Sequence, residues 1–163
     1  MIYDVDVVAV AEQALIVLSG PSSREEVDRL AHRLHGLATE AGLRPAGPAM
    51  ARFAGRDPDD ASLGCDVCLP VLPSADGVVP DRVAEARGEW VPLHHALEAV
   101  HAGPRDAVGD AWRAVFEACA ALGYTPAGPL TEVYVTGDAT RAGDATGAGG
   151  PEPVTRVRLP YAR

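Results

Sequence analysis

The sequence repeats itself once, and this repeat limits the folds open to the chain more than any other feature. Residues 42–48 (GLRPAGP) recur as residues 123–129 (GYTPAGP). Two further blocks match in the same order, 18–21 (LSGP) with 101–104 (HAGP) and 67–71 (VCLPV) with 157–161 (VRLPY). Two copies are too few for a solenoid. The repeat therefore predicts two similar halves, related by a pseudo-twofold axis, in which each half covers the apolar face of the other.

Each half has the pattern strand, helix, strand, strand. In the first half, the apolar run 14–18 is typical of a short strand closed by a turn. Ser23 opens a capping box that starts a helix, apolar residues then recur at helical spacing, and Gly42 stands where a glycine ends a helix. The closing strands are predicted at residues 50–53 and 66–69.

The second half repeats this plan. A stripe of apolar residues at helical spacing ends at Gly123, and strands are predicted at residues 131–135 and 154–159. Residues 93–100 favour a helix by intrinsic propensity, but the repeat aligns them with the first strand of the other half. Because tertiary context overrides propensity, we predict a strand there.

The predicted fold class is α+β, a tandem pair of strand-helix-strand-strand modules with pseudo-twofold symmetry around a central ligand cleft. We expect a single domain over residues 1–163, with a first module of about residues 1–72 and a second of about residues 89–163. Loops are predicted at residues 55–64, 73–88 and 137–150. The last of these loops is rich in Gly, Ala and Thr and is expected to be mobile.

The composition excludes several classes of function. Of the 163 residues, 47% are hydrophobic, which suits one core, and the formal net charge is −9 at pH 7. The 14 basic residues are all arginines scattered among acids, so we expect no direct nucleic-acid partner. No apolar run could cross a bilayer and no signal peptide is evident, so we expect no membrane partner and a cytoplasmic location. The odd number of cysteines, three, argues against a disulfide framework.

Glu132 is the unusual residue, because Glu is depleted from strands. On its strand it shares a face with Tyr134, while Val133 and Val135 point the other way. We predict that the valines face the helix-packed core and that Glu132 lines the cleft on the opposite face, where lost hydration would favour a cationic aromatic ligand. The repeat aligns Glu132 with Ala51, so only the second half carries the acid. The alternative is a solvated acid on an open sheet face.

The candidate ligand-binding residues are this acid and the aromatic side chains that could surround it: Glu132, Tyr134, Trp112, Phe53, Trp90 and Tyr161. Core packing would explain each aromatic residue equally well. Cys65 and Cys68 are a weak signal for a metal, because side chains three apart on a strand point to opposite faces. The adjacent His94 and His95 cannot share a ligand face for the same reason. We predict no metal site and no cofactor.

Several short motifs, taken in order, resemble the GyrI-like (gyrase-inhibitor-like) small-molecule-binding domains, which include the effector-binding domains of bacterial multidrug-responsive transcription activators. The motifs are LSG at 18–20, AGP at 46–48, VCLPV at 67–71, HAGP at 101–104, EVY at 132–134 and VRLP at 157–160. The resemblance covers nearly the whole chain. It implies paired modules around a central cleft, in which an acid at Glu132 contacts cationic ligands and Tyr134 and Trp112 crowd the same cleft. No helix-turn-helix precedes Tyr3, so transcriptional regulation is expected only with a separate DNA-binding partner.

Three functions remain open. The first is a stand-alone small-molecule-binding protein for apolar or aromatic, often cationic compounds, in drug sensing or sequestration. The second, implied by stand-alone proteins that resemble this family, is a hydrolase that detoxifies electrophilic cyclopropane-containing natural products. Glu132 would then be catalytic, by activating water or protonating the electrophile, and a second acid such as Glu98 or Glu12 should face it. The third is a protein inhibitor that acts on a cellular partner through its acidic surface.

Overall fold

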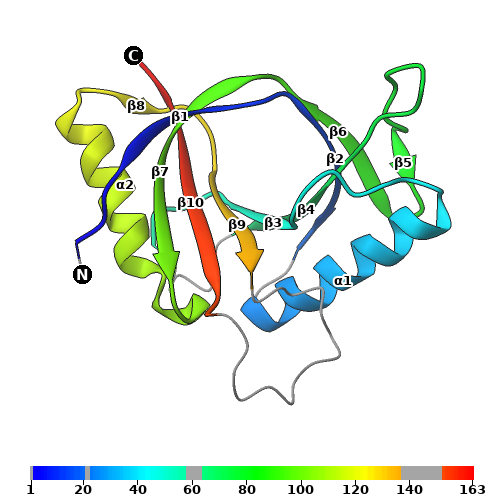
Figure 1. The fold of residues 1–163 in the computed structure, drawn as a ribbon, viewed down its shortest axis with the longest axis horizontal. Helices are drawn as coiled ribbons and strands as arrows, with labels where there is room; N and C mark the ends of the chain where they lie inside the picture. Colours follow the sequence, from blue (N-terminus) through cyan, green and yellow to red (C-terminus); the bar gives the residue numbers. More distant parts are fainter. Residues whose placement is uncertain (1, 21–22, 58–63, 137–151) are drawn as a thin grey trace.

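The structure is a computed structural model in which residues 2–20, 23–57, 64–136 and 152–163 are described. Within these ranges, one antiparallel sheet of ten strands carries two α-helices (Figure 1). This arrangement confirms the α+β class. The predicted loop at residues 137–150 lies outside the described residues.

The elements of the first part of the chain are β1 Asp6–Val10, β2 Gln13–Ser19, α1 Arg24–Glu40, β3 Met50–Phe53, β4 Cys65–Val71, β5 Arg82–Val83 and β6 Ala86–Val91. Those of the second part are β7 His94–Ala102, a short 3₁₀ turn η1 Arg105–Ala107, α2 Gly109–Ala121, β8 Thr125–Pro126, β9 Leu130–Thr136 and β10 Val154–Ala162. The prediction of a strand where propensity favoured a helix is confirmed by β7.

The order of the strands shows the predicted symmetry. The sheet runs β1-β7-β10-β9-β3-β4-β2-β6-β5, so the triplet β7-β10-β9 of the second module mirrors the triplet β2-β4-β3 of the first. The two triplets meet where β3 pairs with β9, and Ala51 stands opposite Glu132 in that pairing. These two residues are equivalent in the repeat. The pseudo-twofold axis therefore passes through the pair of Ala51 and Glu132.

The repeated PAGP motif has the same structural role in both modules. Just after α1 and α2, Gly42 and Gly123 have φ angles of +71° and +72°, which only glycine adopts without strain. The motif then docks on the last strand of its own module through two equivalent hydrogen bonds of 2.8 Å, in which the amide of Ala46 donates to the carbonyl of Pro70 and that of Ala127 to that of Pro160. The most visible similarity in the sequence therefore specifies how each helix returns to the sheet.

The prediction of one loop over residues 73–88 is wrong, because β5 and the start of β6 lie there. The segment carries Pro, Gly and charged residues, which hide the strand pattern. Its backbone nevertheless pairs with β2, from Val91 opposite Gln13 to Arg87 opposite Val17. The hydrogen bonds of this pairing, rather than apolar alternation, define β6.

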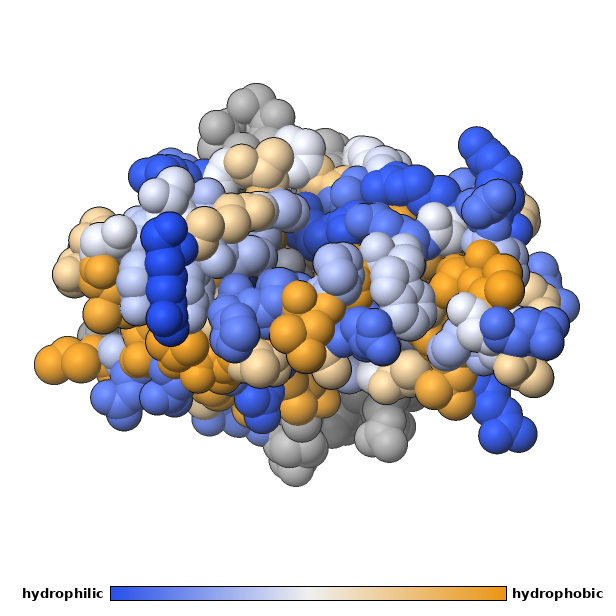
Figure 2. All heavy atoms as spheres, turned by 90° about the horizontal axis from the view of Figure 1, so that it is seen from above, coloured by the Kyte–Doolittle hydropathy of each residue, from blue (hydrophilic) through white to orange (hydrophobic). Residues whose placement is uncertain are grey.

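A long two-stranded ribbon arches over one face of the sheet. β1 pairs with β7 and β2 with β6 in one continuous register, since Val10 stands opposite His94 and Gln13 opposite Val91. These paired segments, which we call the ribbon, are residues 6–17 and 87–98. Figure 1 shows the ribbon passing over the top of the molecule and joining the two ends of the sheet. Its outer surface mixes hydrophilic and hydrophobic residues (Figure 2).

The two helices lie on the other face of the sheet. α1 packs on β2 and β4, and α2 packs on β7 and β10, so the central pair β3–β9 lies between the helices. The main core forms on this face and includes Leu34, Leu69 and Trp112. A smaller cluster on the ribbon side includes Met50 and Val133. Neither helix is long and apolar enough to span a membrane, as far as the described residues go.

Gly88 on β6 offers a sharp test of this packing. A Cβ atom at this position would lie 1.8 Å from the carbonyl oxygen of Pro80. Gly88→Ala should therefore lower the free energy of unfolding by about 1–3 kcal/mol, measured by urea denaturation. Gly36→Ala on α1 is the matched control, because nothing lies within 4 Å of its added Cβ. Gly36→Ala should raise the free energy of unfolding by about 0.5–1 kcal/mol. Two variants of equal stability would contradict the close approach of Pro80.

Candidate functional site

Glu132 is fully buried at the centre of the sheet, with 0% of its surface exposed. Its Oε2 accepts a hydrogen bond of 2.8 Å from Nε1 of Trp112 on α2. Its Oε1 accepts one of 2.9 Å from the hydroxyl of Tyr134, two residues along β9. Each carboxylate oxygen thus has an aromatic donor, which compensates part of the cost of removing the acid from water.

The predicted face of Glu132 is wrong. Leu130 and Tyr134, which share its face of β9, belong to the main core on the helix side. Val133 instead belongs to the smaller cluster on the ribbon side. The expectation failed because the helix side was assumed to be covered by apolar helix stripes, whereas the central strands lie between the helices. The full burial of Glu132 also contradicts the alternative of a solvated acid.

One more of the predicted aromatic residues, Phe53, lies in this cluster. Phe53 on β3 packs edge-on against Trp112, with the ring centroids 5.1 Å apart and the planes at 61°. Phe53 belongs to the first module and Trp112 to the second. The structure therefore gathers Glu132, Tyr134, Trp112 and Phe53 where the modules meet.

The other two predicted aromatic residues lie elsewhere. Trp90 is on β6, where it is 48% exposed. Tyr161 is near the end of β10 and stacks on Tyr124, with a centroid distance of 4.6 Å.

Arg105 is a member of the site that sequence reasoning missed. Its Cζ lies 4.2 Å from the centroid of the Tyr134 ring, in cation–π geometry. The same guanidinium forms an ion pair with Asp28 on α1, which belongs to the first module. No pattern marked this arginine; its place directly after the HAGP block, at the turn into α2, was the one available hint.

The cysteines follow the predicted alternation. Cys65 belongs to the main core and Cys68 to the cluster on the ribbon side, so their thiols lie on opposite faces of β4. Burial raises the pKa of the Cys68 thiol to about 12, which keeps it protonated and unreactive. Across the described ranges, no three His, Cys, Asp or Glu residues are grouped as metal ligands.

No family model and no curated protein matches the sequence. The fold, however, is similar to several solved structures. The C-terminal domain of EcmrR superposes with a TM-score of 0.79 at 15% identity, over 100% of this chain and 99% of that one. A hydrolase from Listeria innocua superposes with a TM-score of 0.61 at 13% identity, over 97% of this chain and 91% of that one. SAV2435 bound to tetraphenylphosphonium superposes with a TM-score of 0.57 at 13% identity, over 99% of this chain and 94% of that one.

These similarities extend over the whole chain, and they confirm that it has the GyrI-like fold its motifs resemble. At this level of identity they establish the fold alone.

The hydrogen bond from Trp112 should contribute measurably to stability. Trp112→Phe keeps a large ring but leaves one buried oxygen of Glu132 without this donor, so the free energy of unfolding should fall by about 1–3 kcal/mol in urea denaturation. Trp90→Phe, at an exposed position, should stay within about 0.5 kcal/mol of the parent protein. Equal stability of the two variants would mean that the bond to Glu132 does not hold the cluster.

Proposed function

We propose that the protein binds apolar aromatic molecules, often cationic, beside Glu132 on the helix side of the sheet, and so senses or sequesters them. One observation carries this proposal. A fully buried carboxylate is held by two aromatic donors, and a guanidinium already lies over one of those rings.

The chemistry of the cluster suits a lipophilic cation. The faces of Tyr and Trp rings attract positive charge, and a desolvated carboxylate gains most from a cation that also lacks tightly bound water. Arg105 stands where the positive centre of such a ligand would lie, over the Tyr134 ring. Because Glu132 is fully buried, a ligand must displace Arg105 or separate it from α1 to reach the acid. The ion pair with Asp28 on α1 holds the guanidinium in its present place, so moving Arg105 requires this pair to shift or break.

The comparisons support a ligand of this class. Tetraphenylphosphonium, the ligand of SAV2435, is a bulky aromatic cation, and that protein shares the fold over nearly its whole length. Tetraphenylphosphonium is therefore the first probe to use here.

The hydrolase alternative has less support, although solved structures of this fold from Listeria innocua are called hydrolases. Of the two acids considered as a partner for Glu132, Glu98 lies on the ribbon side, paired with Arg156 and Arg158. Glu12 is exposed between β1 and β2. Neither stands beside Glu132. The third reading, a protein inhibitor, rests on acidic composition alone.

Glu132→Gln tests the proposal. Trp90→Phe provides the background, because it leaves Trp112 as the sole tryptophan and its fluorescence as a reporter of the site. Losing the charged acceptor should weaken tetraphenylphosphonium binding about 5- to 150-fold, equivalent to about 1–3 kcal/mol. A neutral aromatic ligand should change much less, because its binding depends on apolar burial.

Glu98→Gln is the matched control, since it removes the same charge from a buried acid on the opposite face. Its affinity for tetraphenylphosphonium should stay near that of the parent. Equal effects of Glu132→Gln and Glu98→Gln, or no binding by the parent protein, would refute the proposal.

Arg105→Met should have the opposite effect. Removing the resident cation frees the Tyr134 face, so tetraphenylphosphonium should bind about 2- to 30-fold more tightly, the equivalent of one cation–π contact of about 0.5–2 kcal/mol. Arg113→Met is the control, because Arg113 is exposed on α2 and pairs only locally with Asp110. Weaker binding of tetraphenylphosphonium by Arg105→Met would contradict this prediction and would mean that Arg105 helps to hold the ligand.

A further inference from the structure

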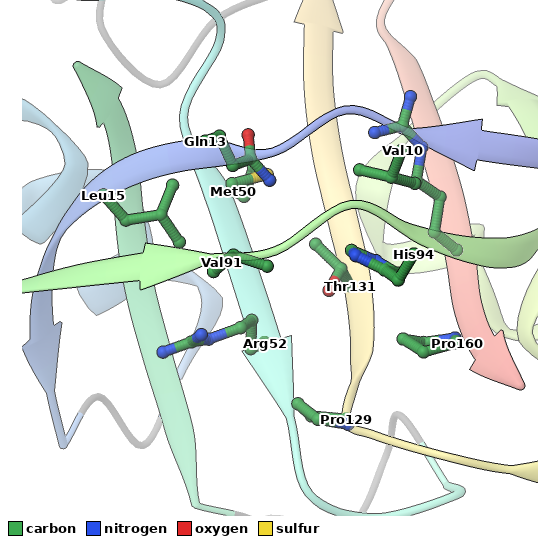
Figure 3. A pocket seen from close by; sticks show the side chains of 11 residues that line it. Val10, Gln13, Leu15, Met50, Arg52, Val91, His94, Pro129, Thr131 and Pro160 are labelled. Carbon is green, nitrogen blue, oxygen red and sulfur yellow. The ribbon is translucent and has the colours of Figure 1, made fainter. Parts of the chain in front are cut away.

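A cavity lies on the face of the sheet opposite the helices, beneath the ribbon. Its volume is about 100 Å³. Figure 3 shows side chains of the ribbon and of the central strands surrounding one space. The eleven lining residues are Val10, Gln13, Leu15, Met50, Arg52, Val91, His94, Pro129, Thr131, Arg158 and Pro160. Six of these eleven side chains are apolar.

The charge of this wall is unlike that of the chain. None of the eleven described lining residues is acidic, while two are arginines, in a protein of net charge −9. The acids that pair with these arginines stand outside the lining: Glu89 and Asp66 beside Arg52, and Glu98 beside Arg158. The cavity therefore presents two positive groups and no acidic one, beside the uncharged polar side chains of Gln13 and Thr131 and the imidazole of His94.

Arg52 holds an unused donor. Its terminal nitrogens donate to Glu89 at 2.7 and 2.9 Å and to Asp66 at 3.1 Å. The hydrogen bond from Arg52 lowers the pKa of Glu89, so this carboxylate stays ionised and keeps the guanidinium in place. The Nε–H of Arg52 is buried and has no hydrogen-bond partner among the described residues. An unmet buried donor is unfavourable, and an acceptor atom on a ligand would satisfy it.

The local network does not oppose an anion at this point. The pKa of Asp66 is also lowered: burial acts to raise it, but the Ser19 hydroxyl and the neighbouring guanidinium groups of Arg52 and Arg87 outweigh burial. Two arginines, Arg52 and Arg87, thus balance two ionised acids. Arg156 and Arg158 share the single carboxylate of Glu98, which leaves one positive charge in excess, and Arg158 lies in the same cavity wall.

The volume limits the ligand. An engineered apolar cavity of about 150 Å³ accommodates benzene, so about 100 Å³ suits a molecule of roughly six or fewer non-hydrogen atoms. We propose that this cavity binds a small aliphatic monocarboxylate of about three or four carbons, with its chain against Leu15, Met50 and Val91 and its carboxylate accepting from Nε–H of Arg52. This site is separate from Glu132, and the proposal stands independently of the function proposed above.

Methyl NMR can test this site directly, with butyrate as the probe. The chain has two methionines, and Met50 lines the cavity. In protein labelled with [methyl-¹³C]methionine, sodium butyrate should shift the Met50 signal saturably, against sodium chloride at equal ionic strength. Butylammonium, of the same length and opposite charge, should not. No saturable shift with butyrate, or an equal shift with butylammonium, would overturn the proposal.

Two matched pairs of variants locate the carboxylate. Arg52→Lys keeps the charge but loses Nε–H, and should weaken butyrate binding about tenfold. Arg87→Lys alters the same ion-pair network outside the cavity and should leave butyrate affinity unchanged. Equal effects of these two substitutions would contradict the assignment.

If Arg52→Lys does not fold, Arg158→Gln against Arg156→Gln makes the same comparison, because both arginines pair with Glu98 and only Arg158 lines the cavity. Only Arg158→Gln should weaken butyrate binding. Glu132→Gln should leave butyrate binding intact, so the outcome here is read separately from that for tetraphenylphosphonium.

Discussion

The antiparallel pairing of β3 with β9 is the constraint on which the rest of the molecule depends. It joins the two modules at their common axis, where Ala51 faces its own counterpart, Glu132. Equivalent positions that meet on an axis share one space, so two large side chains cannot both occupy it. Two acids there would also repel each other in a buried setting. The small Ala51 therefore leaves room for a single buried carboxylate, and this explains why the two halves differ at this position.

Alternation along these central strands separates two kinds of chemistry. On the helix side, Glu132 collects aromatic donors and the cation of Arg105. On the ribbon side, the cavity wall carries the guanidinium groups of Arg52 and Arg158. The Nε–H of Arg52 there has no hydrogen-bond acceptor among the described residues. Because successive side chains of a strand point to opposite faces, one thin sheet holds an acidic centre and a basic centre back to back. The ligands that we propose for the two faces have opposite charges.

The repeat was sufficient to predict the modules, the strand at β7 and the central position of Glu132. It succeeded because each PAGP turn forms a backbone hydrogen bond with the last strand of its module, β4 or β10, and the same residues are needed for this bond in both halves. Three features of the structure could not be predicted from the sequence. The polar segment of β6 lacks the apolar alternation that reveals a strand, the face of Glu132 depends on where the helices stand, and Arg105 reaches its site through tertiary contacts with Tyr134 and Asp28. Each of these features is set by partners distant in sequence, which local patterns do not carry.

The ribbon has a consequence for how the chain reaches its native state. β1 comes from the first half but pairs with β7 of the second, and β6 pairs back with β2 of the first. The halves thus exchange strands within one chain, and neither completes its own sheet. The units of the repeat are therefore not independent folding units. Forming the ribbon requires contacts between residues far apart in sequence, and such contacts slow folding. During synthesis, the edge strands of the first half remain unpaired until β6 and β7 have emerged.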